Sequence, residues 1–126
     1  MSLGYLLDSH ILVWLDSGNA RLRPPILETL RRAERRYLSA VTAWELGMKQ
    51  AAGKLRLRVP VGTMLDAFGL LELPIAMRHG DRAALLPLHH RDPFDRMLVA
   101  QALEEDLILV TGDEELAQYG VPVLIV

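Results

Sequence analysis

Short, wholly apolar runs alternate with longer amphipathic segments from one end of this 126-residue chain to the other. A strand that is apolar at every position is buried on both faces, which is the situation in a parallel sheet covered by helices. The expected strands span residues 4–8, 37–40, 70–74, 107–113 and 121–126. The pattern therefore predicts an α/β fold, a three-layer sandwich with a central parallel sheet and helices on both faces.

The amphipathic segments predict helices, and several of these carry terminal signals. Gly18 ends the first helix, Pro24 and Pro25 begin the second, Ser39 caps the third and Gly53 ends it. The expected helices span residues 9–18, 23–36, 39–53, 61–69, 76–86, 93–105 and 114–120.

The composition is that of an ordinary globule, with 51% hydrophobic and 24% charged residues, and the length predicts one domain over residues 1–126. No apolar stretch approaches the ~20 residues that cross a bilayer, and the first residues do not resemble a signal peptide, so no membrane association is expected. The absence of Cys excludes disulfides and fits a cytoplasmic protein. The net charge of −2 lacks the basic excess typical of nucleic-acid-binding proteins.

Two carboxylates directly follow expected strands. Asp8 comes after the run GYLL, and Asp113 comes shortly after LILV. Parallel α/β sheets bind their ligands beyond the carboxyl ends of the strands, so both residues are candidates for a functional site. Each also precedes a helix, and an N-cap role alone explains either residue equally well.

Glu45 lies on the apolar side of its helix, at helical spacing from Val41, Met48 and Ala52. An ionised carboxylate on a buried face is costly unless a partner compensates for it. A functional role accounts for this position. The alternative is an ion pair with Lys49, four residues further along the helix.

The stretch HRDPFDRMLVAQA contains two carboxylates at the start of one apolar helix. Asp92 suits the N-cap and Pro93 the first helical position, which puts Asp95 at the third. Asp95 can close a capping box there, although Glu or Gln is the usual residue and Asp is one methylene shorter. Because Asp92 alone can cap the helix, Asp95 is available for another role.

If the fold brings these four acids to one edge of the sheet, their mutual repulsion favours a bound cation. Two like charges about 4 Å apart repel by roughly 4 kcal/mol at an effective dielectric of 20. Oxygen-only ligands favour Mg²⁺ or Mn²⁺ over Zn²⁺, and such a site suits phosphodiester hydrolysis. The candidate catalytic and metal-binding residues are Asp8, Glu45, Asp95 and Asp113.

The chain resembles the PIN domain, and within it the VapC-type toxin ribonucleases of prokaryotic toxin–antitoxin pairs. The likeness runs over essentially the whole chain and is carried, in family order, by YLLDSHILVWL, SAVTAWELGMKQAAGKL, LPLHHRDPFDRMLVAQAL and LILVTGDEELAQYGVPVLIV. The resemblance implies a metal-dependent endoribonuclease that acts on RNA, uses Mg²⁺ or Mn²⁺, is inhibited by a cognate antitoxin and forms a homodimer.

Matched motif by motif, the resemblance assigns the family's acids to the same four carboxylates. Ser9 and Thr111 stand where the family tends to have hydroxyl groups beside the acids, and Asp92 matches a cap that holds its loop. Gly112 departs from the pattern, because many relatives have a larger or basic residue there. This departure puts in doubt a phosphate contact from that position and does not affect the acids.

An acidic site that acts on RNA needs nearby cations to hold the phosphates. Arg91 and Arg96 flank Asp95, and Lys49 lies one turn after Glu45. We expect these three to contact phosphate or to orient ligands; plain ion pairs with neighbouring carboxylates are the alternative. The run RRAERR (31–36) reads as a charged helix surface, either solvated or lining an RNA groove.

Other functions fit less well. A metal-free ribonuclease would use histidines as acid and base, but adjacent histidines such as His89 and His90 point apart on regular backbone. Response-regulator receivers and haloacid-dehalogenase-type phosphatases need a further acid close to Asp8, where Ser9 and His10 stand. A catalytically silent PIN module that binds RNA or protein remains the alternative to an enzyme.

Overall fold

A computed structural model of the chain describes residues 3–126. Five parallel strands form a central sheet in the order β3-β2-β1-β4-β5. The strands are β1 (Gly4–Leu7), β2 (Arg35–Ser39), β3 (Leu71–Leu73), β4 (Ile108–Thr111) and β5 (Val123–Ile125). The predicted parallel sheet is confirmed.

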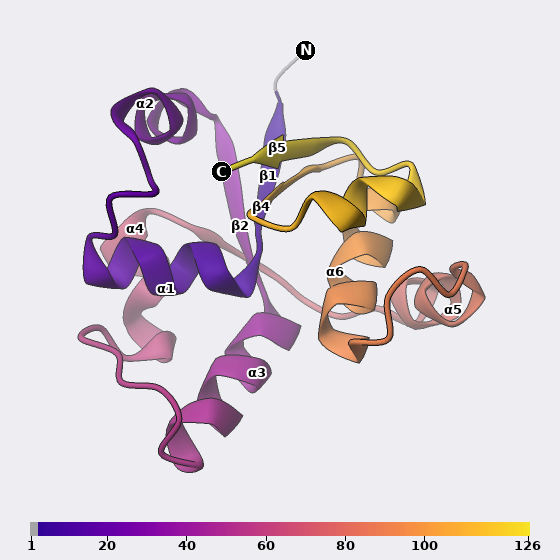
Figure 1. Cartoon of the computed structure of the whole chain (residues 1–126), viewed down its shortest axis with the longest axis horizontal. Helices are drawn as coiled ribbons and strands as arrows, with labels where there is room; N and C mark the ends of the chain where they lie inside the picture. The colour runs from indigo at the N-terminus through magenta and orange to yellow at the C-terminus, as the bar shows by residue number, and fades with distance from the viewer. Residues whose placement is uncertain (1–2) are drawn as a thin grey trace.

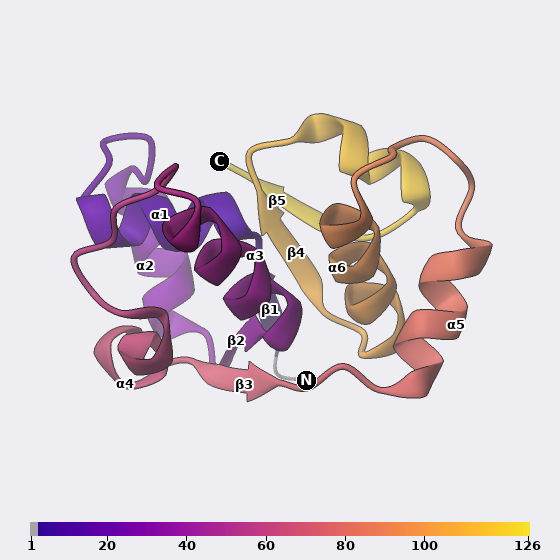
Figure 2. The ribbon, with the colours of Figure 1, turned by 90° about the horizontal axis from the view of Figure 1, so that it is seen from below.

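Helices cover both faces of the sheet (Figures 1 and 2). On one side lie α1 (Ser9–Ser17), α2 (Pro24–Arg32) and α4 (Met64–Phe68), the last of which follows a short 3₁₀ turn, η1 (Val61–Thr63). On the other side lie α5 (Met77–Leu85), α6 (Pro93–Glu104) and the 3₁₀ helix η2 (Glu114–Tyr119). Helix α3 (Ala40–Ala51) extends from the carboxyl ends of the strands. This is the predicted three-layer α/β sandwich.

Strand β1 explains why the strands are apolar throughout. Tyr5 and Leu7 belong to the hydrophobic core under α1, α2 and α4, whereas Leu6 belongs to the core under α6. All three side chains are buried. Since successive side chains of a strand point to opposite faces, a strand between two cores has no solvent-facing position for a polar residue.

The strand order places a topological switch at β1. From β1 the chain builds β2 and β3 on one side and then crosses to build β4 and β5 on the other. The backbone N–H of Asp8 donates to the Val110 carbonyl at 2.9 Å, which ties the end of β1 to β4. The crevice beyond a switch of this kind is the usual ligand site of an open parallel sheet.

The predicted helix 23–36 is too long. Helix α2 ends at Arg32, and Arg35 and Arg36 pair with Gly4 and Tyr5 as the first residues of β2. The Arg36 guanidinium group also donates to the backbone of Leu30 and Gly69, at 2.8 and 2.9 Å. The four arginines of RRAERR therefore do not share a helix surface, because pairing with β1 overrides the local helical pattern.

Smaller differences concern the ends of elements. The expected helix 114–120 is a 3₁₀ helix, and the expected strands 107–113 and 121–126 are shorter. The predicted cap at Ser39 is confirmed, since its hydroxyl accepts from the Val41 N–H at 3.1 Å. Within residues 3–126, no helix combines the length and apolar character needed to cross a membrane.

A buried polar network connects α5 to α6. His79 is 1% exposed; its Nδ1 accepts from the Ala76 N–H and its Nε2 lies 2.9 Å from Glu105 Oε1. The Gln101 amide reaches the Pro74 carbonyl and, through its oxygen, the Ser39 hydroxyl. The hydrogen bond to His79, followed in importance by that to Arg78, lowers the pKa of Glu105 below its usual value of 4.5.

We predict that Glu105 contributes to acid sensitivity. A carboxylate whose pKa is lowered by folding stabilises the fold above its unfolded pKa, and this contribution is lost as the pH falls through the folded pKa. Glu105→Gln should therefore flatten the loss of unfolding free energy between about pH 5 and pH 3, measured by urea denaturation. The exposed Glu34→Gln is the control, and equal acid sensitivity of wild type and Glu105→Gln would contradict this role.

Candidate active site

Four segments that are distant in sequence bring acidic side chains to the carboxyl edge of the sheet. Asp8 follows β1, Glu45 lies in α3, Asp95 lies in the first turn of α6, and Asp113 follows β4. The negative charges of Asp8 and Glu45 both raise the pKa of Asp95, so these three carboxylates are close enough to interact. Asp113 joins the group through His90.

Asp8 is held rigidly at the end of β1. Its side chain is 3% exposed; Oδ1 accepts from the Ser9 N–H at 2.6 Å, and Oδ2 accepts from the Thr111 hydroxyl at 2.7 Å. Burial raises its pKa, although these hydrogen bonds and nearby His10 act in the opposite direction. Asp8 therefore caps α1, as the alternative interpretation held, and also lies in the acidic cluster.

Glu45 is 5% exposed and has a partner for each carboxylate oxygen. The Ser9 hydroxyl donates to Oε1 at 2.7 Å, and the Lys49 ammonium group donates to Oε2 at 2.8 Å. This hydrogen bond with Glu45 is the main reason that the pKa of Lys49 is raised. The ion pair considered for Glu45 is thus present, and Ser9 connects this carboxylate to the loop that holds Asp8.

Asp95 is the carboxylate whose ionisation the site disfavours most clearly. Burial, followed by the negative charges of Asp8 and Asp92, raises its pKa from 3.8 to about 7. The Asp92 side chain alone caps α6, because it accepts from the N–H groups of Phe94 and Asp95 at 2.8 and 3.3 Å. The backbone N–H of Asp92 donates to His90 Nδ1, so Asp95 does not close a capping box through that group.

His90 connects the third and fourth acids. Its Nε2 lies 3.5 Å from Asp95 Oδ2 and 3.3 Å from Asp113 Oδ2. Sequence reasoning missed this role, since it treated the two adjacent histidines as a rival catalytic pair. The neighbouring ring, His89, packs against Tyr119 instead, as expected of side chains that point apart. The sequence contains one signal for this role. His90 lies two residues before the capping residue Asp92, and the backbone N–H of Asp92 can hold the imidazole ring in place.

Asp113 has a capping contact as well as its place beside His90. Its Oδ1 accepts from the Glu115 N–H at 3.0 Å, and its own N–H donates to the Thr111 hydroxyl. One donor atom each from His90, Asp113 and Glu115 lies within 4.8 Å of the others, which is compatible with a shared metal ion.

The chemistry of these donors fits a hard divalent cation. The cluster offers carboxylate oxygens from four segments, one imidazole and no thiolate. Burial, followed by the negative charges of Asp8 and Asp92, raises the pKa of Asp95, and a cation bound beside this carboxylate would favour its ionised form. The edge of the sheet is therefore an acidic site suited to metal ions.

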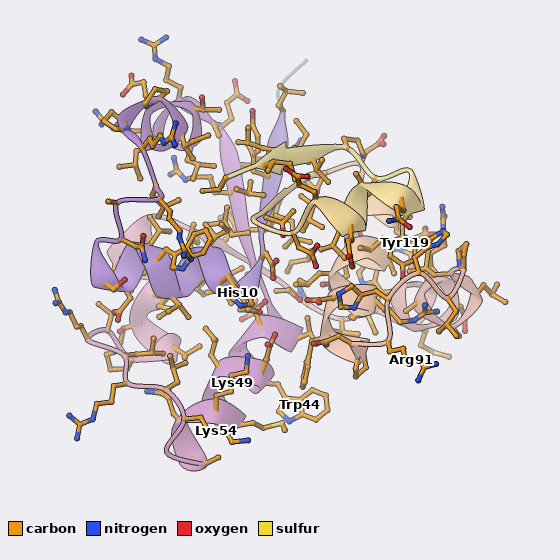
Figure 3. All side chains as sticks on the ribbon, viewed as in Figure 1. His10, Trp44, Lys49, Lys54, Arg91 and Tyr119 are labelled. Atoms are coloured by element: carbon orange, nitrogen blue, oxygen red, sulfur yellow. The ribbon has the colours of Figure 1, made fainter. Side chains whose placement is uncertain are left out.

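The predicted cationic residues have different surroundings. The Arg96 guanidinium group donates to the carbonyls of Ala83, Leu86 and Pro87 at 2.9 Å each. It satisfies the carbonyls at the end of α5, which gives Arg96 a structural role, and its expected contact with phosphate stays a prediction. Arg91 lies on the outer side of the α5–α6 loop, far from Lys49 (Figure 3). Lys49, among the three, reaches the acidic cluster.

Comparisons with known proteins agree with this architecture. The PIN domain family model matches residues 5–122. A protein named Ribonuclease VapC22 from Mycobacterium tuberculosis is 28% identical over 120 residues, which are 93% of this chain and 92% of that protein.

Solved structures show the same fold at low sequence identity. VapBC2 from Rickettsia felis, bound to a DNA fragment from its promoter, has a TM-score of 0.75 at 17% identity, with 98% of both chains covered. VapBC-1 from nontypeable Haemophilus influenzae has a TM-score of 0.68 at 20% identity and the same coverage. Since the family model spans nearly the whole chain, this protein belongs to the PIN domain family.

Proposed function

We propose that this PIN protein is a metal-dependent endoribonuclease and the toxin of a toxin–antitoxin pair. The observation that carries the proposal is the group of carboxylates at the switch point of the sheet, where Asp8 and Glu45 are buried and where burial and the neighbouring negative charges raise the pKa of Asp95 to about 7. The relative named Ribonuclease VapC22 supports the activity. The neighbours VapBC2 and VapBC-1, together with a toxin–antitoxin complex from Klebsiella pneumoniae, support an antitoxin partner.

Mg²⁺ or Mn²⁺ is the proposed cofactor, with Asp8 and Asp95 as its main ligands. Glu45 and Asp113 complete the acidic shell, directly or through water. A divalent ion supplies electrostatic stabilisation of the attacked phosphodiester and makes water a stronger nucleophile near neutral pH.

The neighbouring side chains hold the acids in position. Thr111 donates to Asp8, and Ser9 donates to Glu45, so each hydroxyl fixes the direction of one carboxylate. Lys49 compensates the charge of buried Glu45. His90 lies between Asp95 and Asp113, where its ring can orient both carboxylates.

The proposed partners are an RNA substrate, a cognate antitoxin and a second copy of the chain. The alternative is a PIN module that binds RNA or protein without cleaving it. An intact set of four acids, each held by a specific partner, favours the enzyme. Cleavage of single-stranded RNA that requires Mg²⁺ or Mn²⁺ and stops in excess EDTA supports the proposal, whereas RNA binding without cleavage under any metal condition would indicate the silent module.

We predict that Asp95→Asn abolishes most cleavage without unfolding the protein. Mutation of residues that only support metal ligands costs 10–100-fold, so loss of a ligand should lower kcat/KM by roughly 100-fold or more. The measurement is cleavage of a fluorogenic RNA, with circular dichroism to check folding. Asp81→Asn, at an exposed position of α5, is the matched control. Full activity in folded Asp95→Asn would remove Asp95 from the mechanism.

We also predict that Mg²⁺ stabilises the protein more at about pH 8 than at about pH 6. Between about pH 4 and pH 7 the Asp95 carboxyl group is protonated in the folded protein and ionised in the unfolded chain. In the metal-free protein the free energy of unfolding that this group contributes therefore decreases as the pH rises through this range. Metal binding displaces this proton, and one group with a pKa of about 7 changes the apparent affinity by about tenfold between these two pH values. Thermal melts at fixed Mg²⁺ concentration measure the effect.

Asp95→Asn is the informative comparison for this experiment. The variant should be more stable than wild type in the absence of metal at about pH 8, because no buried charge forms, and its Mg²⁺ response should lose the pH dependence. Equal Mg²⁺ shifts of wild type at both pH values, or no shift at all, would count against a metal site built around this carboxyl group.

A further inference from the structure

A hollow of about 370 Å³ opens directly beside the acidic cluster. Asp8 and Asp113 form its acidic wall, and the rest is lined by His10, Trp14, Arg21 and Gly112. His10 lowers the pKa of Asp8, whereas Trp14 and Arg21 are not among the groups that hold the acids in place. They therefore call for a different explanation from the carboxylates.

The rest of the lining combines an indole ring with an imidazole and a guanidinium group. The Arg21 guanidinium carbon lies 5.2 Å from the centre of the Trp14 ring. The His10 and Trp14 rings meet edge to face, with centroids 6.3 Å apart. Aromatic rings and arginine side chains are the groups on which single-stranded nucleic acids stack their bases, whereas phosphates pair with the cations.

Gly112 allows the indole to take this position. A Cβ atom built on Gly112 would lie 3.0 Å from Trp14 Cη2, closer than side chains normally approach. The glycine lies between Thr111, which holds Asp8, and Asp113. The absence of a side chain at Gly112 thus lets the indole ring approach the segment that carries Asp113.

A second hollow, of about 290 Å³, lies on the other side of His10. Its lining includes Ser9, Lys49 and Lys54, so positive charge flanks the acidic cluster on this side too. Figure 3 shows His10 and Lys49 at the end of the sheet, with Lys54 further along the same part of the molecule. A strand that crosses the acids between the two hollows meets cations on both sides.

We propose that the hollow at Trp14 is a nucleobase subsite for single-stranded RNA, which takes the base of the nucleotide next to the cleaved phosphodiester. The base lies against the Trp14 wall, Arg21 pairs with the adjoining phosphate, and the strand continues past His10 toward Lys49 and Lys54. This inference rests on the proposed nuclease function, and it names the groups that position the substrate.

Intrinsic fluorescence tests the subsite, because Trp14 and Trp44 are the two tryptophans of the chain. Trp44 is 61% exposed and packs against Phe94, away from the hollow. In the Trp44→Phe protein, a single-stranded hexaribonucleotide added with Ca²⁺ in place of Mg²⁺ should quench the emission of Trp14 in a saturable way. In the Trp14→Phe protein, the emission of Trp44 should not change.

Binding and cleavage by further variants complete the test. Trp14→Leu and Arg21→Gln should each raise the Kd for the oligonucleotide and the KM for cleavage by roughly 5- to 150-fold, as expected for loss of one stacked base or its phosphate contact, with a smaller effect on kcat. Gly112→Ala should act in the same direction by displacing the indole. Arg56→Gln, at an exposed arginine, and Gly80→Ala, where a methyl group meets open space, should match wild type.

The outcomes separate this inference from the proposed function. If wild type cleaves RNA while the Trp14 and Arg21 variants bind and cleave as wild type does, with no quenching of Trp14, the subsite is wrong and the nuclease stands. Binding and quenching by wild type without cleavage would overturn the nuclease and support the subsite. Absence of both binding and cleavage would overturn both proposals. Circular dichroism of each variant ensures that only folded protein is compared.

Discussion

The burial of neighbouring carboxylates, together with the repulsion between them, is the physical constraint around which this end of the molecule is organised. Asp8 and Glu45 are almost completely removed from solvent, and burial together with neighbouring charge raises the pKa of Asp95 to about 7. A stable fold seldom collects acids in this way without a compensating interaction. The nearby hydroxyl groups and Lys49 supply part of the compensation, and a divalent cation would supply the rest.

The fold determines where this repulsion occurs. The carboxyl ends of parallel strands lie at one edge of the sheet, and the order β3-β2-β1-β4-β5 makes β1 and β4 the strands that flank the switch point. The apolar strands between two helical layers fix the backbone at Asp8 and Thr111. The sheet, buried between two hydrophobic cores, therefore presents acids that a less tightly packed scaffold would allow to move apart. Hydrogen bonds from neighbouring residues then set the direction of each carboxylate.

Much of this arrangement is predictable from the sequence, because it depends on local signals and on one general rule. The apolar strands, the amphipathic helices and the N-caps at Ser39 and Asp92 are readable from periodicity and residue type. The rule for parallel sheets then predicts that acids after strands meet at one edge. The resemblance to PIN toxins adds the assignment of roles, which spacing alone does not provide. Contacts between helices and strands explain the features that the sequence did not predict.

The structural features that the sequence did not reveal have physical causes. Arg35 and Arg36 continue a good helical pattern, yet pairing with β1 draws them into the sheet. Arg96 looks free beside Asp95 in the sequence, whereas the carbonyls at the end of α5 take up its guanidinium group. His90 points at the acids because the backbone of Asp92 holds its other nitrogen. Each outcome depends on a partner or a side-chain direction that one-dimensional spacing does not encode.

The central claim, that these carboxylates share a divalent cation, is tested most directly by anomalous diffraction from crystals soaked in Mn²⁺. The account predicts a strong anomalous peak within coordination distance of Asp8 and Asp95, which weakens or disappears in Asp95→Asn crystals. Well-ordered carboxylates with no anomalous peak between them at saturating Mn²⁺ would contradict it.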